Sequence, residues 1–238
     1  MITLYRIDLQ FFGGRGATSA SASNGSNWAN MPFTTMTDSD AAQLRDDMDG
    51  QYEPDVVNAI KMYISSADAN GDGFSYSQNL NYKLDNGQPL DATEQYIDDF
   101  IGQGMHGIGK NTTLFRACHD DILQGLGVSD YSKMSEGQLQ STLIGTTFKT
   151  KSYMSASYDA SKNPFTNPSS GVSGGREVYM HVKCKGDTQV VFGAKSQAEM
   201  IINKGTGFKI TGVHYDGTTA YPRNKGARPR VVIDIETE

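Results

Sequence analysis

Three separated segments of the chain carry polar side chains that could do chemistry together. The first holds a single arginine, Arg116, in an otherwise apolar run. The second holds Ser155 and Ser157, and the third holds Gln197 and Glu199, with one residue between the members of each pair. Alternate residues of an extended segment project to the same side, so each pair is expected to share a face. A guanidinium fork suits phosphate groups, and a carboxylate suits a developing positive charge.

Each of these segments has a plainer explanation when it is taken alone. An arginine on a strand most often forms a surface salt bridge, and alternating serines most often mark a solvated face. A glutamate before an apolar run most often marks the edge of a strand. The order, spacing and flanking residues of the three segments, taken together, favour one common site.

In this order the three segments resemble the motifs of the ADP-ribosyltransferase superfamily, in its Arg–Ser–Glu class. The family pattern is an arginine on an early strand, a Ser-Thr-Ser strand and a Glu/Gln-x-Glu motif. These correspond here to Arg116, to residues 155–157 and to residues 197–199. The third motif and the sequence that follows it, QAEMIINKGTGFKITGV, are the most specific part of a resemblance that covers roughly residues 56–238. The chain departs from the pattern at Ala156, where the family has threonine.

The resemblance implies that NAD⁺ is the donor of an ADP-ribose group that is transferred to a host protein. Glu199 would stabilise the oxocarbenium-like centre that forms as the nicotinamide–ribose bond breaks. Ser155 would hydrogen-bond this carboxylate and hold it in the productive orientation. Arg116 would grip the phosphates of the dinucleotide with its planar fork.

The resemblance implies further contacts with the donor. Ser157 lies on the same strand as Ser155, and the backbone of Ala117 would bond the nicotinamide amide, although many relatives have glycine there. Phe165 would either stack on the nicotinamide or anchor its own loop, and Arg176 would make a second phosphate contact. No Gly-x-Gly-x-x-Gly loop precedes a helix, so the NAD⁺ site is not expected to be Rossmann-like.

The choice of acceptor is expected to depend on Gln197. Relatives that modify arginine usually carry glutamate at this position, whereas those with glutamine, such as the bacterial Rho-modifying exoenzymes, use other acceptors. We therefore expect asparagine or glutamine as the first choice of acceptor and a hydroxyl as the second. Phe192, in the loop of residues 191–196, is expected to contact the target. With water as the acceptor, the same residues would make an NAD⁺ glycohydrolase.

The composition limits the function classes. The net charge of −6 over 238 residues disfavours general nucleic-acid binding. No apolar run reaches the roughly 18–20 residues that cross a bilayer, and the first residues lack the apolar stretch of a secretory signal. Membrane association is therefore not expected. The two cysteines, Cys118 and Cys184, are expected to be buried free thiols, which suits a reducing compartment.

A metal site is not expected, because no HExxH or Cys/His spacing occurs. Residues 68–73 match the first half of a calcium-binding EF-hand loop, but the twelfth position is Asn79 where such a loop needs glutamate. A polar turn that joins two helices is the better account of this segment. A calcium-dependent binding module stays as an alternative that rests on this loop alone.

The periodicity of apolar residues predicts helices first and strands later. Helices are expected over residues 38–50, after Pro54, and after a capping box formed by Asp91 and Glu94. Strands are expected over residues 112–117, 152–157, 178–184, 189–192, 199–202, 208–215 and 230–235. These elements predict an α+β fold with N-terminal helices packed on two largely antiparallel β-sheets, which in the resembled family form an NAD-binding cleft. The expected domain spans residues 32–238, with a helical part at about 37–110 and a β-rich part at about 111–238.

Residues 1–31 are expected to form a flexible tail and linker, because residues 13–30 are rich in Gly, Ala, Ser and Asn. The start IDLQFFGGRG resembles the first residues of some phage structural proteins. A phage virion-associated head protein that carries this domain is therefore the alternative from another class. The enzyme is expected to act in the host cytoplasm, delivered by a phage capsid or another particle rather than by a signal peptide.

Overall fold

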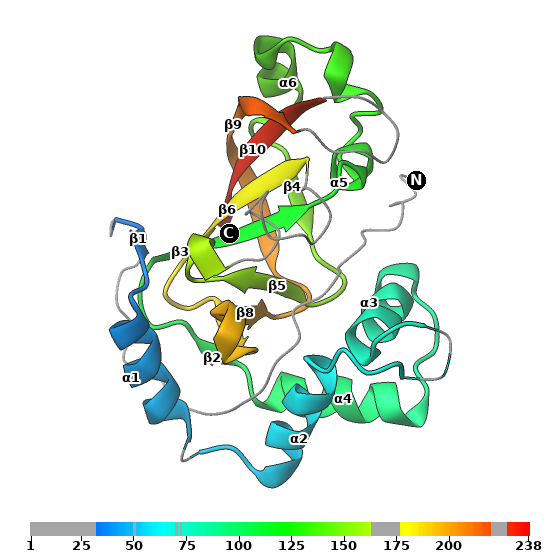
Figure 1. The fold of residues 1–238 in the computed structure, drawn as a ribbon, viewed down its shortest axis with the longest axis vertical. Coiled ribbons are helices and arrows are strands. Elements are labelled where there is room, and N and C mark those ends of the chain that lie inside the picture. The colour runs from blue at the N-terminus through cyan, green and yellow to red at the C-terminus, as the bar shows by residue number, and fades with distance from the viewer. Residues whose placement is uncertain (1–31, 50, 70, 72, 163–176, 220–227) are drawn as a thin grey trace.

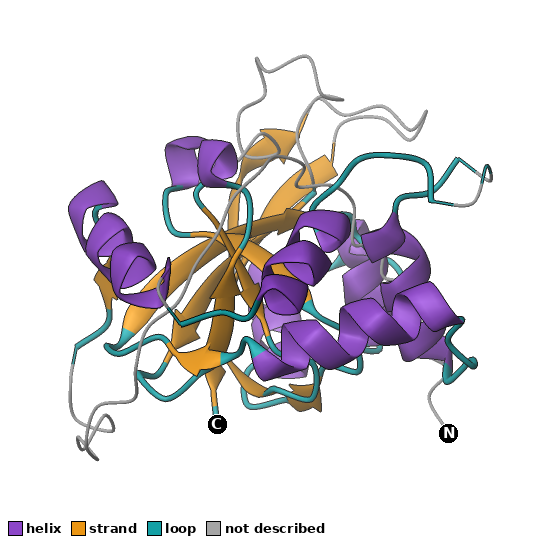
Figure 2. Ribbon diagram, turned by 90° about the horizontal axis from the view of Figure 1, so that it is seen from below, coloured by secondary structure: helices purple, strands orange, loops and turns teal. Residues whose placement is uncertain are grey.

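A computed structural model gives the structure of the chain and describes residues 32–49, 51–69, 71, 73–162, 177–219 and 228–238. The strands form the centre of the molecule and the helices lie on the outside (Figure 1, Figure 2). The predicted tail of residues 1–31 lies outside the described residues, and so do Phe165 and Arg176.

The described residues contain α1 (Asp38–Asp49), α2 (Pro54–Tyr63), α3 (Tyr76–Asn86), α4 (Ala92–Gln103), α5 (Asp121–Gly125) and α6 (Glu136–Leu143). The three predicted helices are confirmed as α1, α2 and α4. The Asp91 side chain accepts hydrogen bonds from the backbone N–H of Thr93 and Glu94, and the Glu94 side chain accepts one from Asp91 N–H, so the predicted capping box is confirmed. The helices α3, α5 and α6 were not predicted, and α5 and α6 interrupt the region expected to be rich in strands.

The strands are β1 (Thr34–Thr35), β2 (His106–Gly107), β3 (Thr112–Cys118), β4 (Thr147–Lys149), β5 (Met154–Ser157), β6 (Val178–Cys184), β7 (Gln189–Phe192), β8 (Glu199–Ile202), β9 (Gly207–Thr219) and β10 (Arg228–Thr237). They pair in the order β2-β7-β8-β5-β3-β6-β10-β9-β4, with β1 beside β3. All pairs are antiparallel except β1 with β3 and β6 with β10. The predicted α+β class and the largely antiparallel pairing are confirmed.

The two sheets expected from the sequence are joined into one hydrogen-bonded sheet of ten strands. The junction lies between β3 and β5, which pair at one register position in the described residues, Phe115 opposite Ser157. On one side of it, β3 pairs with β6 along its whole length, and on the other side β5 pairs with β8 over four positions. The sheet therefore consists of two well-paired halves that meet at a narrow junction.

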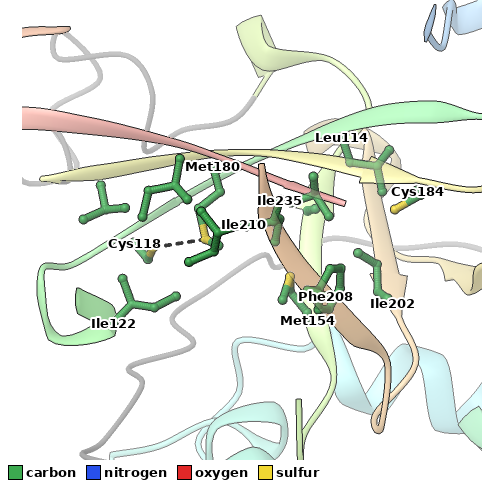
Figure 3. Packing of buried hydrophobic residues seen from close by; sticks show 14 of the residues in the cluster. Leu114, Cys118, Ile122, Met154, Met180, Cys184, Ile202, Phe208, Ile210 and Ile235 are labelled. Carbon is green, nitrogen blue, oxygen red and sulfur yellow. Dashed lines mark hydrogen bonds between the residues drawn. The ribbon is translucent and has the colours of Figure 1, made fainter. Parts of the chain in front are cut away.

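Two hydrophobic clusters hold these halves. The larger cluster lies between strands of both halves, and Figure 3 shows Met154 and Ile202 from one half near Phe208 and Ile210 from the other. Alternate residues of β5, β7 and β8 face the opposite way and pack against α2, α3 and α4. These three helices lie together beside this half of the sheet in Figure 1, whereas α6 packs near β9 at the other end.

Both cysteines are buried and free, as the sequence predicts. Cys118 Sγ lies 3.7 Å from Met180 Sδ within the larger cluster (Figure 3). Burial raises the pKa of the Cys184 thiol well above its ordinary range. The calcium-loop-like segment forms the connection between α2 and α3, where Gly73 N–H donates to the Asp68 carboxylate at 3.0 Å.

Candidate active site

Glu199 opens β8 and carries a buried carboxylate that is 1% exposed. The backbone N–H of Ala194 donates to Glu199 Oε2 at 2.8 Å, and the Ser155 hydroxyl makes a side-chain hydrogen bond to the same carboxylate. Burial is the main cause that raises the pKa of Glu199 from its ordinary 4.5 to about 7. These two hydrogen bonds and the positive charges of Arg116 and Arg45 oppose that rise. The carboxyl group is therefore half titrated at neutral pH.

Arg116 lies in β3, beside the junction of the sheet halves, and is 5% exposed. Its Nη1 donates to the backbone carbonyl of Ser155 in β5 at 2.5 Å. The structure thus brings together the arginine, the serine and the glutamate that lie far apart in the sequence. Because a guanidinium carries five N–H donors, the bond to Ser155 uses only part of the donor capacity of this side chain.

Ser157 pairs with Glu199 in the strand register of β5 and β8. Its buried hydroxyl lies 2.7 Å from the Asp159 carbonyl oxygen and 2.8 Å from the Gln197 carbonyl oxygen. The hydroxyl also accepts a hydrogen bond from Asp159 N–H. In this structure Ser157 therefore holds the turn that contains Gln197.

The expectation that Gln197 and Glu199 share one face of an extended segment is wrong. Residues Lys195–Gln197 form a 3-10 turn, because the Ala194 carbonyl accepts hydrogen bonds from the N–H groups of both Gln197 and Glu199. Ala198 then takes a left-handed conformation with φ of 51°, the one such non-glycine residue that the structure describes. The chain thus turns between the two side chains, which leaves Glu199 buried and Gln197 half-buried.

The expected position of Phe192 also needs correction. Phe192 is the last residue of β7 rather than part of a loop, and it is 2% exposed. Its ring packs edge-to-face on Tyr158, with ring centroids 6.4 Å apart, and the Arg45 guanidinium lies 4.4 Å from its centroid. An apolar ring at the end of a buried strand packs into the core, so target contact through Phe192 would require its exposure. The exposed side chains of the turn are Lys195 and Ser196.

Two residues of the site were not expected from the sequence. Arg45 of α1 is buried, and its charge acts on Glu199. Tyr63, the last residue of α2, is buried beside the same group: its hydroxyl accepts from Asn81 Nδ2 at 2.9 Å and contacts the Ser155 hydroxyl. The sequence placed Tyr63 on the buried face of a helix but gave no sign that this face meets the carboxylate.

Ala117 lies between Arg116 and Cys118 in β3, opposite Tyr179 of β6, and is half-buried. In the part of the chain that the structure describes, no group of three or more His, Cys, Asp or Glu side chains could hold a metal ion. None of the described helices has the length and apolar character that a membrane span needs.

Comparisons with known proteins agree with this geometry. A family model described as ADP-ribosyltransferase exoenzyme matches residues 34–235. No curated protein sequence matches the chain.

Several solved structures share the fold. C2-I, the enzymatic component of the C2-toxin from Clostridium botulinum, is 17% identical with a TM-score of 0.56, over 79% of this chain and 45% of that chain. A second ADP-ribosyltransferase from Clostridium botulinum is 18% identical with a TM-score of 0.51, over 79% of this chain and 88% of that chain. BECa, an ADP-ribosylating toxin of C. perfringens solved with NADH, is 13% identical with a TM-score of 0.56, over 79% and 44%. The chain spans less than half the length of C2-I and of BECa, and these identities show a common fold.

Proposed function

The chain belongs to the ADP-ribosyltransferase exoenzyme family, and from this membership we propose that it transfers ADP-ribose from NAD⁺ to a side chain of a host protein. The observation that carries the proposal is the convergence of Arg116, Ser155 and the buried Glu199 at the junction of the two sheet halves. This is the set of groups that glycosidic cleavage of a dinucleotide requires: a cation for phosphates and an oriented carboxylate for a developing cation.

In the proposed reaction the bond between nicotinamide N1 and ribose C1′ breaks, and its electron pair leaves with the nicotinamide. The ribose becomes oxocarbenium-like, and the Glu199 carboxylate accepts a hydrogen bond from the 2′-hydroxyl and stabilises the positive charge. The acceptor then attacks C1′ with its lone pair and gives up its proton. Ser155 and the Ala194 N–H hold the carboxylate throughout.

The phosphates of the donor are assigned to Arg116, with Arg45 as a second cation that the structure adds to the site. Ala117 stays assigned to the nicotinamide amide through its backbone, and Phe165 and Arg176 stay predictions because they lie outside the described residues. Ser157 contributes by holding the turn of residues 195–197, which its hydroxyl contacts at the Gln197 carbonyl.

The test of the proposal uses labelled NAD⁺ and a lysate of host cells. A labelled protein band that forms with the wild-type chain supports transfer to protein. Free ADP-ribose without a band supports the glycohydrolase alternative, in which water is the acceptor. If neither product forms, the proposed function is wrong. Delivery by a phage particle into the host cytoplasm stays a proposal that rests on the start IDLQFFGGRG, and labelled capsid proteins or purified virions would test it.

The acceptor is proposed to be asparagine or glutamine before a hydroxyl, because Gln197 both donates and accepts hydrogen bonds and carries no charge. Replacing Gln197 with glutamate supplies a base at the turn and is expected to change the modified residue while NAD⁺ cleavage is largely kept. Mass spectrometry of the labelled target, and the rate of nicotinamide release without target, measure the two effects. Ser196→Ala, at the exposed neighbour, serves as the control. Loss of nicotinamide release in Gln197→Glu would contradict the assignment of Gln197 to the acceptor.

The pH dependence of NAD⁺ cleavage is expected to follow Glu199. Only the charged carboxylate stabilises an oxocarbenium ion, so kcat/KM is expected to fall as the pH drops below about 7, the raised pKa of this group. The nicotinamide of NAD⁺ is positively charged and favours the carboxylate, so the inflection in kcat is expected at lower pH than that in kcat/KM. Initial rates of nicotinamide release over a pH range of about 5 to 9 measure both. A flat kcat/KM over this range would contradict the role of a titrating carboxylate.

A further inference from the structure

The backbone of Gly193 and Ala194 contacts both the main chain and the side chain of Glu199. Gly193 N–H donates to the Glu199 carbonyl at 3.0 Å, and Glu199 N–H donates to the Ala194 carbonyl at 3.1 Å. A third bond runs from Ala194 N–H to Glu199 Oε2 at 2.8 Å. The glutamate is thus held by two consecutive residues, which follow the end of β7.

The missing side chain of Gly193 leaves the space that the Glu199 carboxyl group occupies. A Cβ on Gly193 would lie 2.5 Å from Glu199 Cδ and 2.7 Å from its Cγ, and closer still to Oε2. These separations are far below the roughly 3.5–4.0 Å at which carbon atoms make favourable contact. The carboxyl group of Glu199 therefore rests directly on the backbone of Gly193.

Space is the reason for glycine at this position. Glycine is often needed where φ is positive, but Gly193 is not among the described glycines with positive φ. Its backbone conformation is therefore open to alanine, and the volume of the Glu199 carboxyl is what excludes a Cβ. Gly193 is thus matched to the glutamate side chain rather than to a turn.

Glu199 has no easy alternative position that would make room. Its backbone is fixed by pairing with Ser157 in β5, and the next residue, Met200, pairs with Phe192 in β7. Rotation of the side chain away from Gly193 would break the bond from Ala194 N–H and would change the contact with Ser155. Displacement by a Cβ must therefore act on the carboxylate itself.

We infer that Gly193 is a positioning residue for the catalytic carboxylate: with the N–H of Ala194 it forms a side-chain-free seat that fixes Glu199 for NAD⁺ cleavage. This inference rests on the proposed function for its activity readout. A misplacement of about 1 Å can cost about 10²-fold in rate. Gly193→Ala is therefore expected to lower kcat for nicotinamide release by about 10²-fold, with little change in the affinity for NAD⁺.

The experiment compares Gly193→Ala with Gly102→Ala. Gly102 lies in α4 with no atom within 4 Å of a Cβ added there, so this control is expected to keep full activity. Equilibrium dialysis of NAD⁺ and the pH profile of kcat/KM separate positioning from general damage. A loss of folded protein lowers the rate at every pH equally, whereas a displaced carboxylate moves the inflection away from about 7. Full activity, or a reduced rate with an unchanged pH profile, would overturn the inference.

Thermal unfolding supplies a second test that needs no activity. Gly193→Ala is expected to lower the unfolding midpoint in the wild-type chain by several degrees but not in a Glu199→Ala chain, because the truncated side chain leaves room for the new Cβ. Equal losses in both chains would place the clash elsewhere and overturn the inference. If the wild-type chain releases no nicotinamide, the proposed function fails, while this stability cycle still decides whether Gly193 seats Glu199.

Discussion

Replacing Glu199 with glutamine is expected to slow NAD⁺ cleavage by about 10²–10³-fold, the cost typical of removing one preorganised group that stabilises transition-state charge. Glutamine has nearly the shape of glutamate, and its carbonyl can still accept the N–H of Ala194, which donates to the carboxylate at 2.8 Å. The loss therefore reports the missing charge rather than a missing contact. Nicotinamide release at saturating NAD⁺ measures it, and Glu236→Gln, on the partly exposed strand β10, is the matched control.

The same substitution is expected to stabilise the folded chain at a pH of about 8. Burial raises the pKa of Glu199 from 4.5 to about 7, so between these values the folded state binds more protons than the unfolded state. The stability of the wild-type chain relative to Glu199→Gln therefore falls as the pH rises through this window, and glutamine does not titrate. Since one pKa unit corresponds to about 1.4 kcal/mol, the relative change between about pH 4 and about pH 8 is about 3 kcal/mol.

Urea unfolding of both chains at pH values of about 4.5, 6 and 8 checks this expectation. The difference in free energy of unfolding is expected to grow in favour of Glu199→Gln from the first pH to the last. A difference that is constant across the range would show that the carboxyl keeps its ordinary pKa. Unchanged NAD⁺ cleavage in Glu199→Gln would show that another group is the catalytic carboxylate.

Arg116→Lys is expected to lower kcat/KM for NAD⁺ by about 10- to 100-fold. Lysine keeps the positive charge but loses the planar fork that binds phosphate bidentately and the reach to the Ser155 carbonyl at 2.5 Å. Hydrogen bonds to charged groups contribute about 1.5–3 kcal/mol, and about 1.4 kcal/mol corresponds to a tenfold change. The increase is expected mainly in KM, because phosphate binding holds the donor in both ground and transition states.

Initial rates over a range of NAD⁺ concentrations measure this effect, and Arg230→Lys is the control. Arg230 lies in β10, where it pairs with Asp216 at 2.6 Å and its guanidinium covers the Tyr179 ring. A lower melting temperature with unchanged KM would assign Arg116 to the junction of β3 and β5 alone. Unchanged stability and unchanged KM would remove Arg116 from the site.

The sequence predicts those parts of the fold whose signals are local. The capping box of Asp91 and Glu94 and the alternation over residues 178–184 are both confirmed. Similar signals at Ser75 with Gln78 and at Ser135 with Gln138 mark the starts of α3 and α6, and capping boxes are present at both. These two helices were therefore within reach of the sequence, whereas the five-residue α5 has no side-chain cap to reveal it.

The parts of the site that the sequence does not predict depend on tertiary contacts. Arg45 belongs to a helix of mostly polar residues, and only the packing of α1 near the Phe192 ring brings it to Glu199. The 3-10 turn before Glu199 depends on two N–H groups that share the Ala194 carbonyl, which leaves no mark in residue types. Gly193 looks like any loop glycine until the carboxyl group that fills its missing side chain is located.

The burial of both cysteines has a practical consequence for finding the target protein. The chain has two cysteines, and both thiols lie in the core, out of reach of an alkylating reagent. A cysteine placed at Ser196, on the exposed side of the turn before Glu199, would be the one accessible thiol of the folded chain. A photo-crosslinker attached there would couple covalently to whatever protein docks at the acceptor side, and could be followed without any step to protect native thiols.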